Sequence, residues 1–494
     1  MKYLMWATVA LVAFSTATGA SEPRASVVKI YVERRYPDYQ FPWSAGTHYA
    51  TTGSGVVIAG KRILTNAHVV SDHTFIQVRR YGGSEKTVAR VASVSHEADL
   101  AILTVDEEDF FDSIPPLPLG DLPEVQQSVV VYGFPLGGDT LSATEGVVSR
   151  IEHQAYVHSG AQLLAVQIDA AINAGNSGGP VVADGTVVGV VMQSIPTAAN
   201  IGYLVPTPVI EHFLRDIEDG KLDGLPAAGF VWQPLESESL RRFLRLPELR
   251  TGVLITRVLP FTPASGKVCA RDVLVAIDGH TVAFDGTIEL RSNLRTNMMQ
   301  YIQQHQIGDL LRLTVFRAGR MEDLEIHLDV QARELKLVPA YQYDTGPTYF
   351  IYGGLVLNPL TANYLQSFQG SPPPHLAVHE RSDPTEPGEQ IVVLNRVLPS
   401  AANIGYHDWQ DRVLAKLNGH RFHNLPELVH LIETASEPVL VFENDEGQMI
   451  VLDRQQVEAE REQLLRTYGI PADRSDNLGD SNALAVGLAR GEPN

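Results

Sequence analysis

Short segments rich in β-branched residues, separated by turns, dominate the chain from Ser26 to about Val205. Val, Ile, Thr and aromatic residues fit a pleated, half-buried surface, so such segments are typical of β-strands. A run of short strands with no long helix between them predicts antiparallel β-barrels or a sandwich. We expect strands at Val27–Val32, Gly55–Ile58, Phe75–Arg79, Leu100–Val105, Val129–Tyr132, Gly146–Ile151 and Val187–Met192.

A helix is expected to close this region. Thr207 can cap its amino terminus, and Pro208 suits its first turn. An apolar stripe at helical spacing follows, and the segment from Gly220 to Pro226 is expected to be a linker. The stripe consists of Val209, Ile210, Phe213, Leu214 and Ile217.

Three sequence blocks recur in the same order in the second half of the chain. The blocks Gly229–Leu235, Arg257–Pro260 and Val273–His280 return as Gly354–Leu360, Arg396–Pro399 and Val413–His420. A period of roughly 125–140 residues fits duplicated small domains rather than solenoid units. Asp-Gly in one copy and Asn-Gly in the other predict hairpin turns. We expect a loop at residues 370–390 and disorder in the tail, residues 470–494.

Charge and cysteine content exclude several classes of function. The formal net charge is -20, and there is one cysteine, Cys269. Nucleic acids and anionic membranes need a basic surface, so neither is expected as a main partner. A single cysteine forms no intramolecular disulfide, and no Cys/His spacing predicts a zinc site. We therefore expect no metal and no cofactor.

Residues 1–20 have the features of a secretory signal. Lys2 precedes an almost continuous apolar run from Tyr3 to Phe14, and small residues ending at Ala20 suit a signal peptidase. The run is shorter than the roughly 20 residues that span a bilayer. The sequence thus predicts an exported protein, periplasmic or secreted, without stable membrane insertion.

The segment Asn173–Pro180 reads Asn-Ala-Gly-Asn-Ser-Gly-Gly-Pro. Glycines on both sides of Ser177 leave its hydroxyl exposed and let the backbone turn tightly. The amides of Gly175 and Ser177 can then point at one spot, as an oxyanion hole requires. The segment also fits the Gly-x-Ser-x-Gly elbow of an α/β-hydrolase esterase. That alternative is disfavoured because a strand, not a helix, follows the serine.

Two upstream residues complete a possible catalytic set. His68 ends an apolar run, and Asp99 heads an apolar strand where its carboxylate can be buried against an imidazole. Serine is a poor nucleophile unless a base takes its proton, and histidine can accept that proton and return it to the leaving group. The chain order His68, Asp99, Ser177 also differs from the order in α/β-hydrolases.

These motifs resemble those of the HtrA/Deg (Do-like) serine proteases. The similarity lies in Thr65-Asn-Ala-His68, Ala98-Asp-Leu-Ala101 and Gly175-Asn-Ser-Gly-Gly179. It implies a mainly β protein with some α structure: a chymotrypsin-like double β-barrel followed by two PDZ-like α+β domains. The second of these is similar to that of the plant Deg group and its bacterial relatives. The implied division is a signal peptide at 1–20, a trypsin-like domain at 26–219, PDZ-like domains at 224–333 and 336–458, and the tail.

The resemblance also implies substrate and partner sites. Ala171 is expected to line the specificity pocket with Val191 and Ile201, which favours a small or medium aliphatic side chain before the cut. PDZ domains add an extended peptide as a strand and hold its C-terminal carboxylate on backbone amides. The residues expected at those loops are Gly229 and Phe230 in one copy and Gly353, Gly354 and Leu355 in the other.

The sequence-based hypothesis is an exported, ATP-independent serine endopeptidase of protein quality control. Its partners would be unfolded or damaged polypeptides and peptide C-termini, and the resemblance implies a homo-oligomer, a trimer or a multiple of one. The alternative is a chaperone or peptide-binding scaffold whose barrel is catalytically idle.

Overall fold

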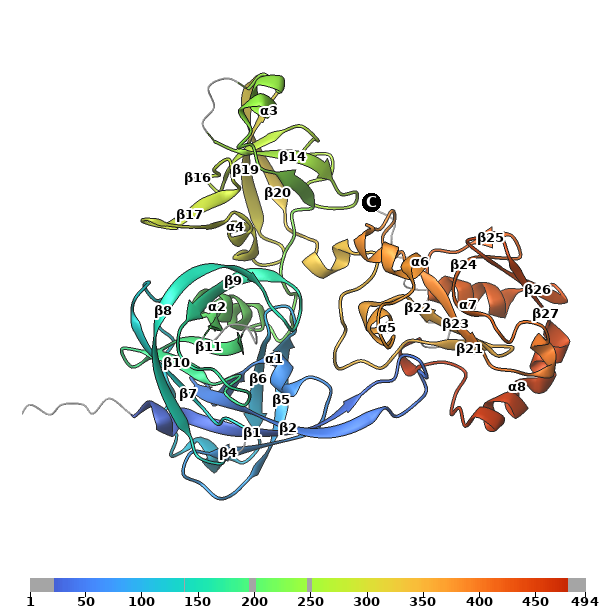
Figure 1. Cartoon of the computed structure of the whole chain (residues 1–494), viewed down its shortest axis with the longest axis horizontal. Coiled ribbons are helices and arrows are strands. Elements are labelled where there is room, and N and C mark those ends of the chain that lie inside the picture. Colours follow the sequence, from blue (N-terminus) through green and yellow to red (C-terminus); the bar gives the residue numbers. More distant parts are fainter. Residues whose placement is uncertain (1–21, 137, 195–200, 247–250, 479–494) are drawn as a thin grey trace, which may run out of the picture.

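The computed structural model describes residues 22–136, 138–194, 201–246 and 251–478. Two closed barrels come first in the chain, and two further domains lie at the top and the right in Figure 1. The predicted class is confirmed, with two β-barrels followed by two α+β domains. The predicted signal peptide, residues 1–20, lies outside the described residues.

Each barrel has six strands in the same order, first-second-third-sixth-fifth-fourth. All pairs are antiparallel, so one barrel topology occurs twice. The first barrel consists of β1 (Val27–Tyr36), β2 (Thr47–Ile58), β3 (Arg62–Thr65), β4 (His73–Arg80), β5 (Thr87–Ser95) and β6 (Leu100–Val105). The second consists of β7 (Ser128–Gly133), β8 (Ser142–Ala155), β9 (Gln162–Ile168), β10 (Pro180–Ala183), β11 (Thr186–Ser194) and β12 (Gly202–Pro206). Each strand predicted above lies within one of these.

Short helical segments connect and close the barrels. They are η1 (Pro23–Ser26), α1 (Ala67–Val70), η2 (Glu108–Phe111) and α2 (Thr207–Asp216). Helix α2 packs Val209, Ile210 and Phe213 against the second barrel, as its apolar stripe predicts. The predicted cap was wrong by one residue. Pro206 occupies the N-cap, and Thr207 is already helical, with its hydroxyl donating to the carbonyl of Val188.

The barrels share one apolar core. Val56, Leu64 and Leu100 of the first barrel belong to the same buried cluster as Val131 and Val190 of the second. Burial of such side chains stabilises the folded state by about 1.5–3 kcal/mol each, and here it also fixes one barrel against the other. Residues carried on facing edges of the two barrels therefore keep a constant separation.

The first C-terminal domain is a curled sheet with the order β13-β14-β15-β19-β20. Its strands are β13 (Phe230–Gln233), β14 (Val253–Val258), β15 (Val273–Ile277), β16 (His280–Thr281), β17 (Thr287–Arg291), β18 (Leu294–Asn297), β19 (Leu310–Arg317) and β20 (Arg320–His327). Its helices are α3 (Glu238–Phe243), α4 (Met299–Gln303) and η3 (Ala332–Leu335).

The second C-terminal domain repeats that order and adds a strand at one edge, giving β21-β22-β23-β24-β26-β27. Its strands are β21 (Phe350–Tyr352), β22 (Leu355–Pro359), β23 (Val392–Val397), β24 (Gln410–Leu417), β25 (His420–Arg421), β26 (Val439–Asn444) and β27 (Met449–Asp453). Its helices are α5 (Ala362–Gln366), α6 (Pro374–Ala377), η4 (Val378–Arg381), η5 (Ala401–Asn403), α7 (Leu425–Thr434), α8 (Arg454–Tyr468) and η6 (Asp476–Leu478).

The internal repeat maps onto equivalent strands of these two domains. Asp278-Gly279 joins β15 to β16 and Asn418-Gly419 joins β24 to β25, each with positive φ at both residues. That geometry is a type I′ hairpin turn, as the sequence predicts. The expected loop at 370–390 differs, because it contains α6 and η4.

The first part of the predicted disordered tail is also folded. Ile470 and Leu478 are buried, and residue 474 forms a bridge with residue 350 at the edge of β21. Residues 479–494 lie outside the described part of the chain.

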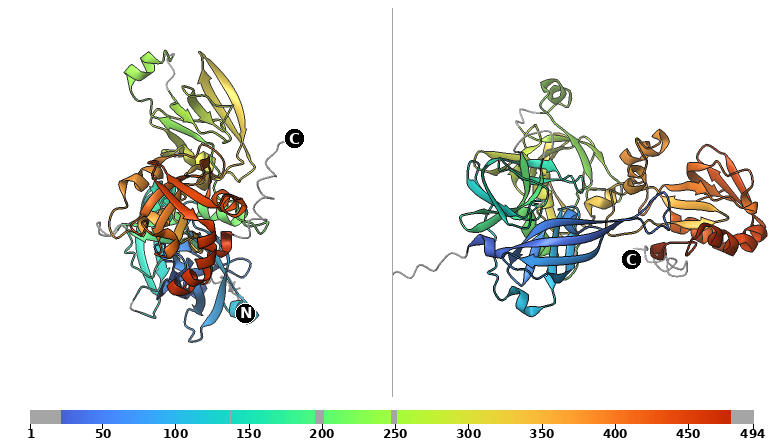
Figure 2. Two further views of the ribbon diagram at one scale, coloured as in Figure 1. Left: turned by 90° about the vertical axis from the view of Figure 1, so that its right-hand side faces the viewer. Right: turned by 60° about the horizontal axis from the view of Figure 1, so that its bottom comes forward.

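A hairpin links the first barrel to the second C-terminal domain. Strands β1 and β2 extend beyond the barrel, and their connection reaches the far domain in Figures 1 and 2. Tyr39 at its tip is buried in a cluster with Val338, Leu360 and Tyr364. The last domain therefore contacts the barrels through this hairpin as well as through the chain that enters it.

Candidate active site

His68 and Asp99 form a tightly bonded pair on the first barrel. His68 lies on the single turn α1, and Asp99 immediately precedes β6 with φ of 52°. One Asp99 oxygen accepts the His68 backbone N–H at 2.8 Å, and the other lies 2.8 Å from His68 Nδ1. A carboxylate only accepts, so Nδ1 carries the proton and Nε2 keeps its lone pair for another donor.

The burial of Asp99 makes this pairing consequential. Its side chain is 1 % exposed, while that of His68 is 31 % exposed. A buried carboxylate without hydrogen bonds would destabilise the fold by several kcal/mol, so its bonds to His68 hold the imidazole in one orientation. Asn66 adds a bond from its side chain amide to the Asp99 carbonyl, at 2.8 Å.

Ser177 lies in the loop between β9 and β10, which faces the first barrel. Ser54 of β2 fastens this loop: its hydroxyl donates to the carbonyl of Gly175 at 2.8 Å, and its N–H donates to the carbonyl of Ser177 at 2.9 Å. The Ser54 hydroxyl also accepts the N–H of Phe134. The sequence analysis missed this role, because no local pattern shows which serine of a strand meets a distant loop.

Gly178 brings the serine loop next to the histidine segment. A Cβ atom at Gly178 would lie 2.1 Å from both the Ser54 carbonyl oxygen and Thr65 Oγ1, and 3.2 Å from the N atom of Asn66. Ser177 therefore neighbours the turn that carries His68. The hydrogen bonds of the described residues include none between the Ser177 hydroxyl and the His68 ring. Such bonds are often long without substrate.

The residues before Ser177 form a tight turn. Asn176 N–H donates to the carbonyl of Asn173 at 3.0 Å, and Gly175 has φ of 96°, which together define a type II turn. The Ala174 carbonyl accepts from Leu136 N–H at 2.8 Å, so the N–H of the same trans peptide, on Gly175, points the opposite way. Neither this N–H nor that of Ser177 has an acceptor among the described residues, so both are available to a ligand.

The expected specificity residues occupy different environments. Ala171 is exposed, Val191 is buried in the second barrel, and Ile201 is half-buried against the same core. Ile172, which the sequence analysis did not name, lies over Gly202, where a Cβ would be 2.1 Å from Ile172 Cδ1. Ile172 and Ile201 therefore both supply apolar surface in this region. Ile172 does so because the loop turns its side chain inward.

The two expected peptide-binding loops differ. In the first C-terminal domain Gly229 precedes β13 and Phe230 is the first residue of that strand, which pairs only with β14 among the described strands. In the second domain Gly353 and Gly354 form a two-residue turn between β21 and β22. Strand β22, which begins at Leu355, is paired on both sides. The first domain therefore offers an open strand edge after its loop, whereas that edge is occupied in the second.

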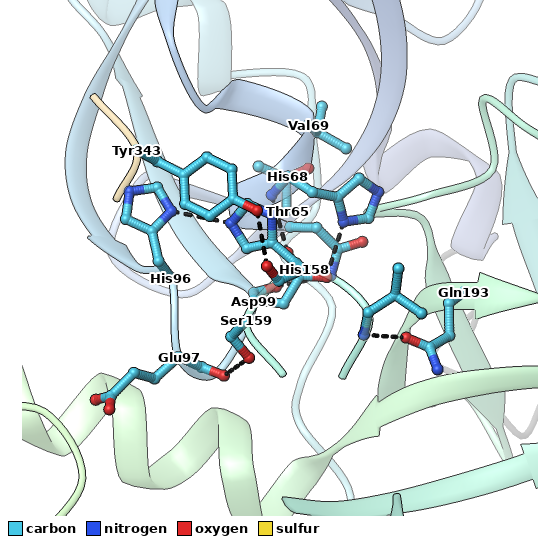
Figure 3. A network of polar contacts seen from close by, with 12 residues as sticks. Thr65, His68, Val69, His96, Glu97, Asp99, His158, Ser159, Gln193 and Tyr343 are labelled. Atoms are coloured by element: carbon cyan, nitrogen blue, oxygen red, sulfur yellow. Dashed lines mark hydrogen bonds and ion pairs between the residues drawn. The ribbon is translucent and has the colours of Figure 1, made fainter. Parts of the chain in front are cut away.

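A cluster of aromatic and histidine side chains lies beside His68 (Figure 3). The ring centroid of His158 is 6.1 Å from that of His68, and Tyr343 stacks on His158 at 3.9 Å. His96 Nδ1 is 3.0 Å from His158 Nε2. Burial lowers the pKa of His158 to about 3, so its ring is neutral near pH 7. Tyr343 comes from the second C-terminal domain, far away in the sequence, and no motif predicted it.

Neither a metal site nor a membrane span is found in the described ranges. No group of three or more His, Cys, Asp or Glu side chains there could hold a metal ion. No helix within the same ranges is long and apolar enough to cross a membrane.

Comparison with known families matches all three parts of the chain. A trypsin-like peptidase domain matches residues 53–190, and PDZ domains match residues 234–328 and 338–477. A solved structure of a serine-to-alanine variant of the HtrA-type protease AlgW with a decapeptide shares the fold, with a TM-score of 0.50 at 24% identity. That match covers 63% of this chain and 97% of the other.

Curated relatives are similar over nearly the whole length. The chloroplastic protease Do-like 2 of Arabidopsis thaliana is 39% identical, over 94% of this chain and 78% of that protein. The mitochondrial protease Do-like 4 of the same plant is 36% identical, over 93% of this chain and 89% of that protein. These similarities, together with the barrels and the paired His68 and Asp99, show that the chain belongs to the HtrA/Deg (Do-like) family of serine endopeptidases.

Proposed function

We propose that the protein cleaves unfolded or damaged polypeptides without ATP, through an acyl-enzyme formed on Ser177. The observation that carries this proposal is the pairing of His68 with a fully buried Asp99 through both carboxylate oxygens. This pairing leaves His68 Nε2 as the ring nitrogen able to take a proton from the serine hydroxyl.

In the proposed first step, Ser177 Oγ attacks the carbonyl carbon of a peptide bond while His68 Nε2 takes the hydroxyl proton. The resulting imidazolium donates this proton to the leaving amine as the C–N bond breaks. A water molecule then attacks the acyl-serine ester, and His68 again accepts and returns a proton. Asp99 keeps the imidazole in the required tautomer and stabilises its charged form.

Gly175 and Ser177 would stabilise the oxyanion of the tetrahedral intermediate. The type II turn points the Gly175 N–H away from Leu136, and both amides lack protein acceptors among the described residues. Donors fixed before the reaction need no reorganisation when the negative charge develops. Loss of one such donor typically lowers kcat by about 100- to 1,000-fold.

The residue before the scissile bond is proposed to be small or medium-sized and aliphatic. Ile201 and the neighbouring Ile172 supply apolar half-buried surface, and Ala171 leaves room beside them. Val191 supports this region from the barrel core. The open edge of β13, behind Gly229 and Phe230, is proposed to bind peptide C-termini as an added strand. Because β22 is paired on both sides, this mode is not proposed for the second PDZ domain.

The proposed setting is outside the compartment of synthesis, with residues 1–20 as a removable export signal and the protein periplasmic or secreted. Chloroplastic and mitochondrial locations belong to the names of the relatives. Amino-terminal sequencing of the mature protein is expected to begin near residue 21, and a mature chain that starts at residue 1 would contradict the proposal. We also propose a trimer or a multiple of one, which the mass from analytical ultracentrifugation would test.

The decisive experiment combines labelling with cleavage. The purified protein is expected to react with a fluorophosphonate at Ser177 and to cleave denatured casein. Ser177→Ala should abolish both, while the exposed-site control Ser84→Ala should change neither. Casein cleavage that survives in Ser177→Ala would show that another group is the nucleophile. An absence of labelling and cleavage in the unsubstituted protein, together with peptide binding, would instead favour the idle scaffold.

A further inference from the structure

The chain that enters the second PDZ domain passes beside His158 and His96, and His158 is the neighbour of His68. We call residues 341–344, which precede β21, the entry segment. Figure 3 shows Tyr343 of this segment beside the rings of His96 and His158. The start of the second PDZ domain, ahead of its first strand β21, therefore lies against the protease site.

Tyr343 fixes His158 by two contacts. Its ring stacks on the imidazole with centroids 3.9 Å apart and an interplanar angle of 23°, and its hydroxyl donates to the His158 carbonyl at 2.7 Å. The same ring lies 4.9 Å from that of His96. Stacking and a hydrogen bond together leave His158 little freedom to move away from His68.

Asp344 holds the cluster from the other side. Its Oδ2 is 2.9 Å from His96 Nε2, and His96 Nδ1 is 3.0 Å from His158 Nε2, so the three side chains form one chain of hydrogen bonds. The backbone N–H of Asp344 donates to Asp72 Oδ1 at 2.8 Å, and that of Asp72 donates to Asp344 Oδ1. Asp72 comes four residues after His68, so this exchange joins the entry segment to the turn that carries the histidine.

The neutral state of His158 suits a place beside the base. His68 becomes an imidazolium during the proposed reaction, and a second charged ring at 6.1 Å would oppose that change. Burial lowers the pKa of His158 to about 3, so His158 does not carry a competing charge near pH 7. Tyr343 and Asp344 are the groups that keep the ring in its buried place.

We propose that Tyr343 and Asp344 are positioning residues of the active site, which hold His158 against His68 and make full activity depend on a seated second PDZ domain. The inference rests on the proposed function, because it takes His68 as the catalytic base. Neither residue touches the substrate in this scheme. Both act through His158, His96 and Asp72.

The hairpin tip supplies a second attachment that keeps the entry segment in place. Asn395 donates to the carbonyl of Tyr39 at 3.0 Å, and Arg396 donates to Gln40 Oε1 at 3.0 Å. The Arg396 guanidinium lies 4.1 Å above the centre of the Phe41 ring. The tip holds the second PDZ domain on the first barrel. The entry segment is therefore fixed at its place near the active site and does not behave as a free linker.

The test compares Tyr343→Ala, Tyr343→Phe and Asp344→Asn with the matched control Gln342→Ala. Gln342 lies in the same segment, but its side chain is exposed, and among the described residues only its backbone forms hydrogen bonds, to the Asn363 amide, which alanine would keep. Fluorophosphonate titration counts active sites, and kcat and KM for a fluorogenic peptide are expressed per active site. The rate constant for labelling of Ser177 is measured in parallel, because that small reagent reports on the nucleophile and its base.

Tyr343→Ala is expected to lower kcat and the labelling rate constant on the order of tenfold, with KM changed less, because displaced catalytic groups lose reactivity steeply. Tyr343→Phe keeps the stacked ring and should restore most of the activity. Asp344→Asn should lie between them, and Gln342→Ala should match the unsubstituted protein.

Unchanged kcat per active site in both Tyr343→Ala and Asp344→Asn would overturn the inference. So would a loss confined to the number of active sites, since that result shows a purely structural role. An unsubstituted protein that is neither labelled nor active would refute the proposed function first, and the two failures are thus distinguishable.

Discussion

Asp99 is the residue on which the geometry of the active site most depends. It is buried, lies in the left-handed region at φ 52°, and uses one oxygen for the His68 backbone and the other for the ring. Asp tolerates this backbone region better than most residues. The same side chain thus determines the helix turn, the tautomer and the orientation of the base.

Asp99→Asn should preserve the fold and nearly abolish catalysis. The Asp99 carboxylate accepts two N–H groups, whereas an amide has one acceptor oxygen and one donor NH2 group. The amide would therefore no longer hold His68 in the tautomer that carries its proton on Nδ1. We expect kcat per active site to fall about 1,000- to 10,000-fold with little change in KM. Steady-state kinetics on a fluorogenic peptide measure this, with exposed Asp109→Asn as the control. A loss smaller than about tenfold would remove Asp99 from the proposed mechanism.

His158 is expected to make stability depend on pH. Its pKa is lowered from 6.5 to about 3 in the folded state, chiefly by burial. Between these values the unfolded chain takes up a proton that the folded chain does not, so stability falls as the pH falls. The slope is at most about 1.4 kcal/mol per pH unit.

Replacing His158 should reduce this dependence. His158→Gln is expected to show a smaller drop in Tm between about pH 7 and about pH 5 than the unsubstituted protein. Differential scanning calorimetry measures the drop, and the exposed-site variant His48→Gln serves as the control. Equal drops in all three proteins would mean that His158 titrates normally in the folded state.

At the scale of elements, the loop between β9 and β10 is held by close backbone approach rather than by large side chains. Gly175 and Gly178 have φ of 96° and 82°, and each lies against backbone atoms of another segment. Ser54 of β2 adds hydrogen bonds to this loop. The loop can come this close to the neighbouring backbone only because glycine has no Cβ.

Gly178→Ala and Gly185→Ala separate two reasons for a glycine, which are a positive φ and a lack of space for a Cβ. Gly185 has nearly the same φ, 80°, but nothing lies within 4 Å of its added Cβ. Its substitution should cost about 1 kcal/mol through backbone strain alone. At Gly178 the Cβ would lie 2.1 Å from Ser54 and Thr65 oxygens. We expect several kcal/mol of destabilisation and loss of Ser177 labelling, measured by urea unfolding and fluorophosphonate reaction. Similar behaviour of both variants would show that the barrels are not so closely apposed.

At the scale of the whole molecule, the hairpin β1–β2 ties the second PDZ domain to the first barrel (Figure 2). Tyr39 at its tip is 8% exposed and packs with Leu360, Tyr364 and Val393. Loss of a buried aromatic side chain typically lowers stability by about 3–5 kcal/mol. We expect a loss of this size to exceed the stability of a small contact between domains. The tip should therefore control whether the second PDZ domain stays docked.

Tyr39→Ala is expected to release this domain without unfolding either barrel. The radius of gyration from small-angle scattering should rise, and trypsin should cut faster near Lys336, which precedes the entry segment. Tyr81→Ala, at a position 42% exposed, is the matched control. Identical scattering and digestion for the two variants would mean that other contacts hold the domain.

The equivalent strands of the two PDZ domains show what sequence comparison captures. The repeated blocks predicted a duplicated small domain, and the Asp278-Gly279 and Asn418-Gly419 turns form as expected. The added strand β21 was not predicted, because whether a three-residue apolar segment pairs with β22 depends on which edge is free. That difference decides which of the two domains offers an edge to a peptide.

By itself, the sequence determined the β-class of the barrels, the duplication, and the residue types at positions 68, 99 and 177, because strand periodicity, turn chemistry and motif spacing are local properties of the chain. Only the tertiary structure decided that Ser54 fastens the serine loop, that Ile172 turns inward, and that Tyr343 donates to the carbonyl of a residue 185 positions earlier. Such contacts depend on how folded domains and distant segments pack against one another. The sequence of each segment alone carries no periodic pattern that reveals its partner.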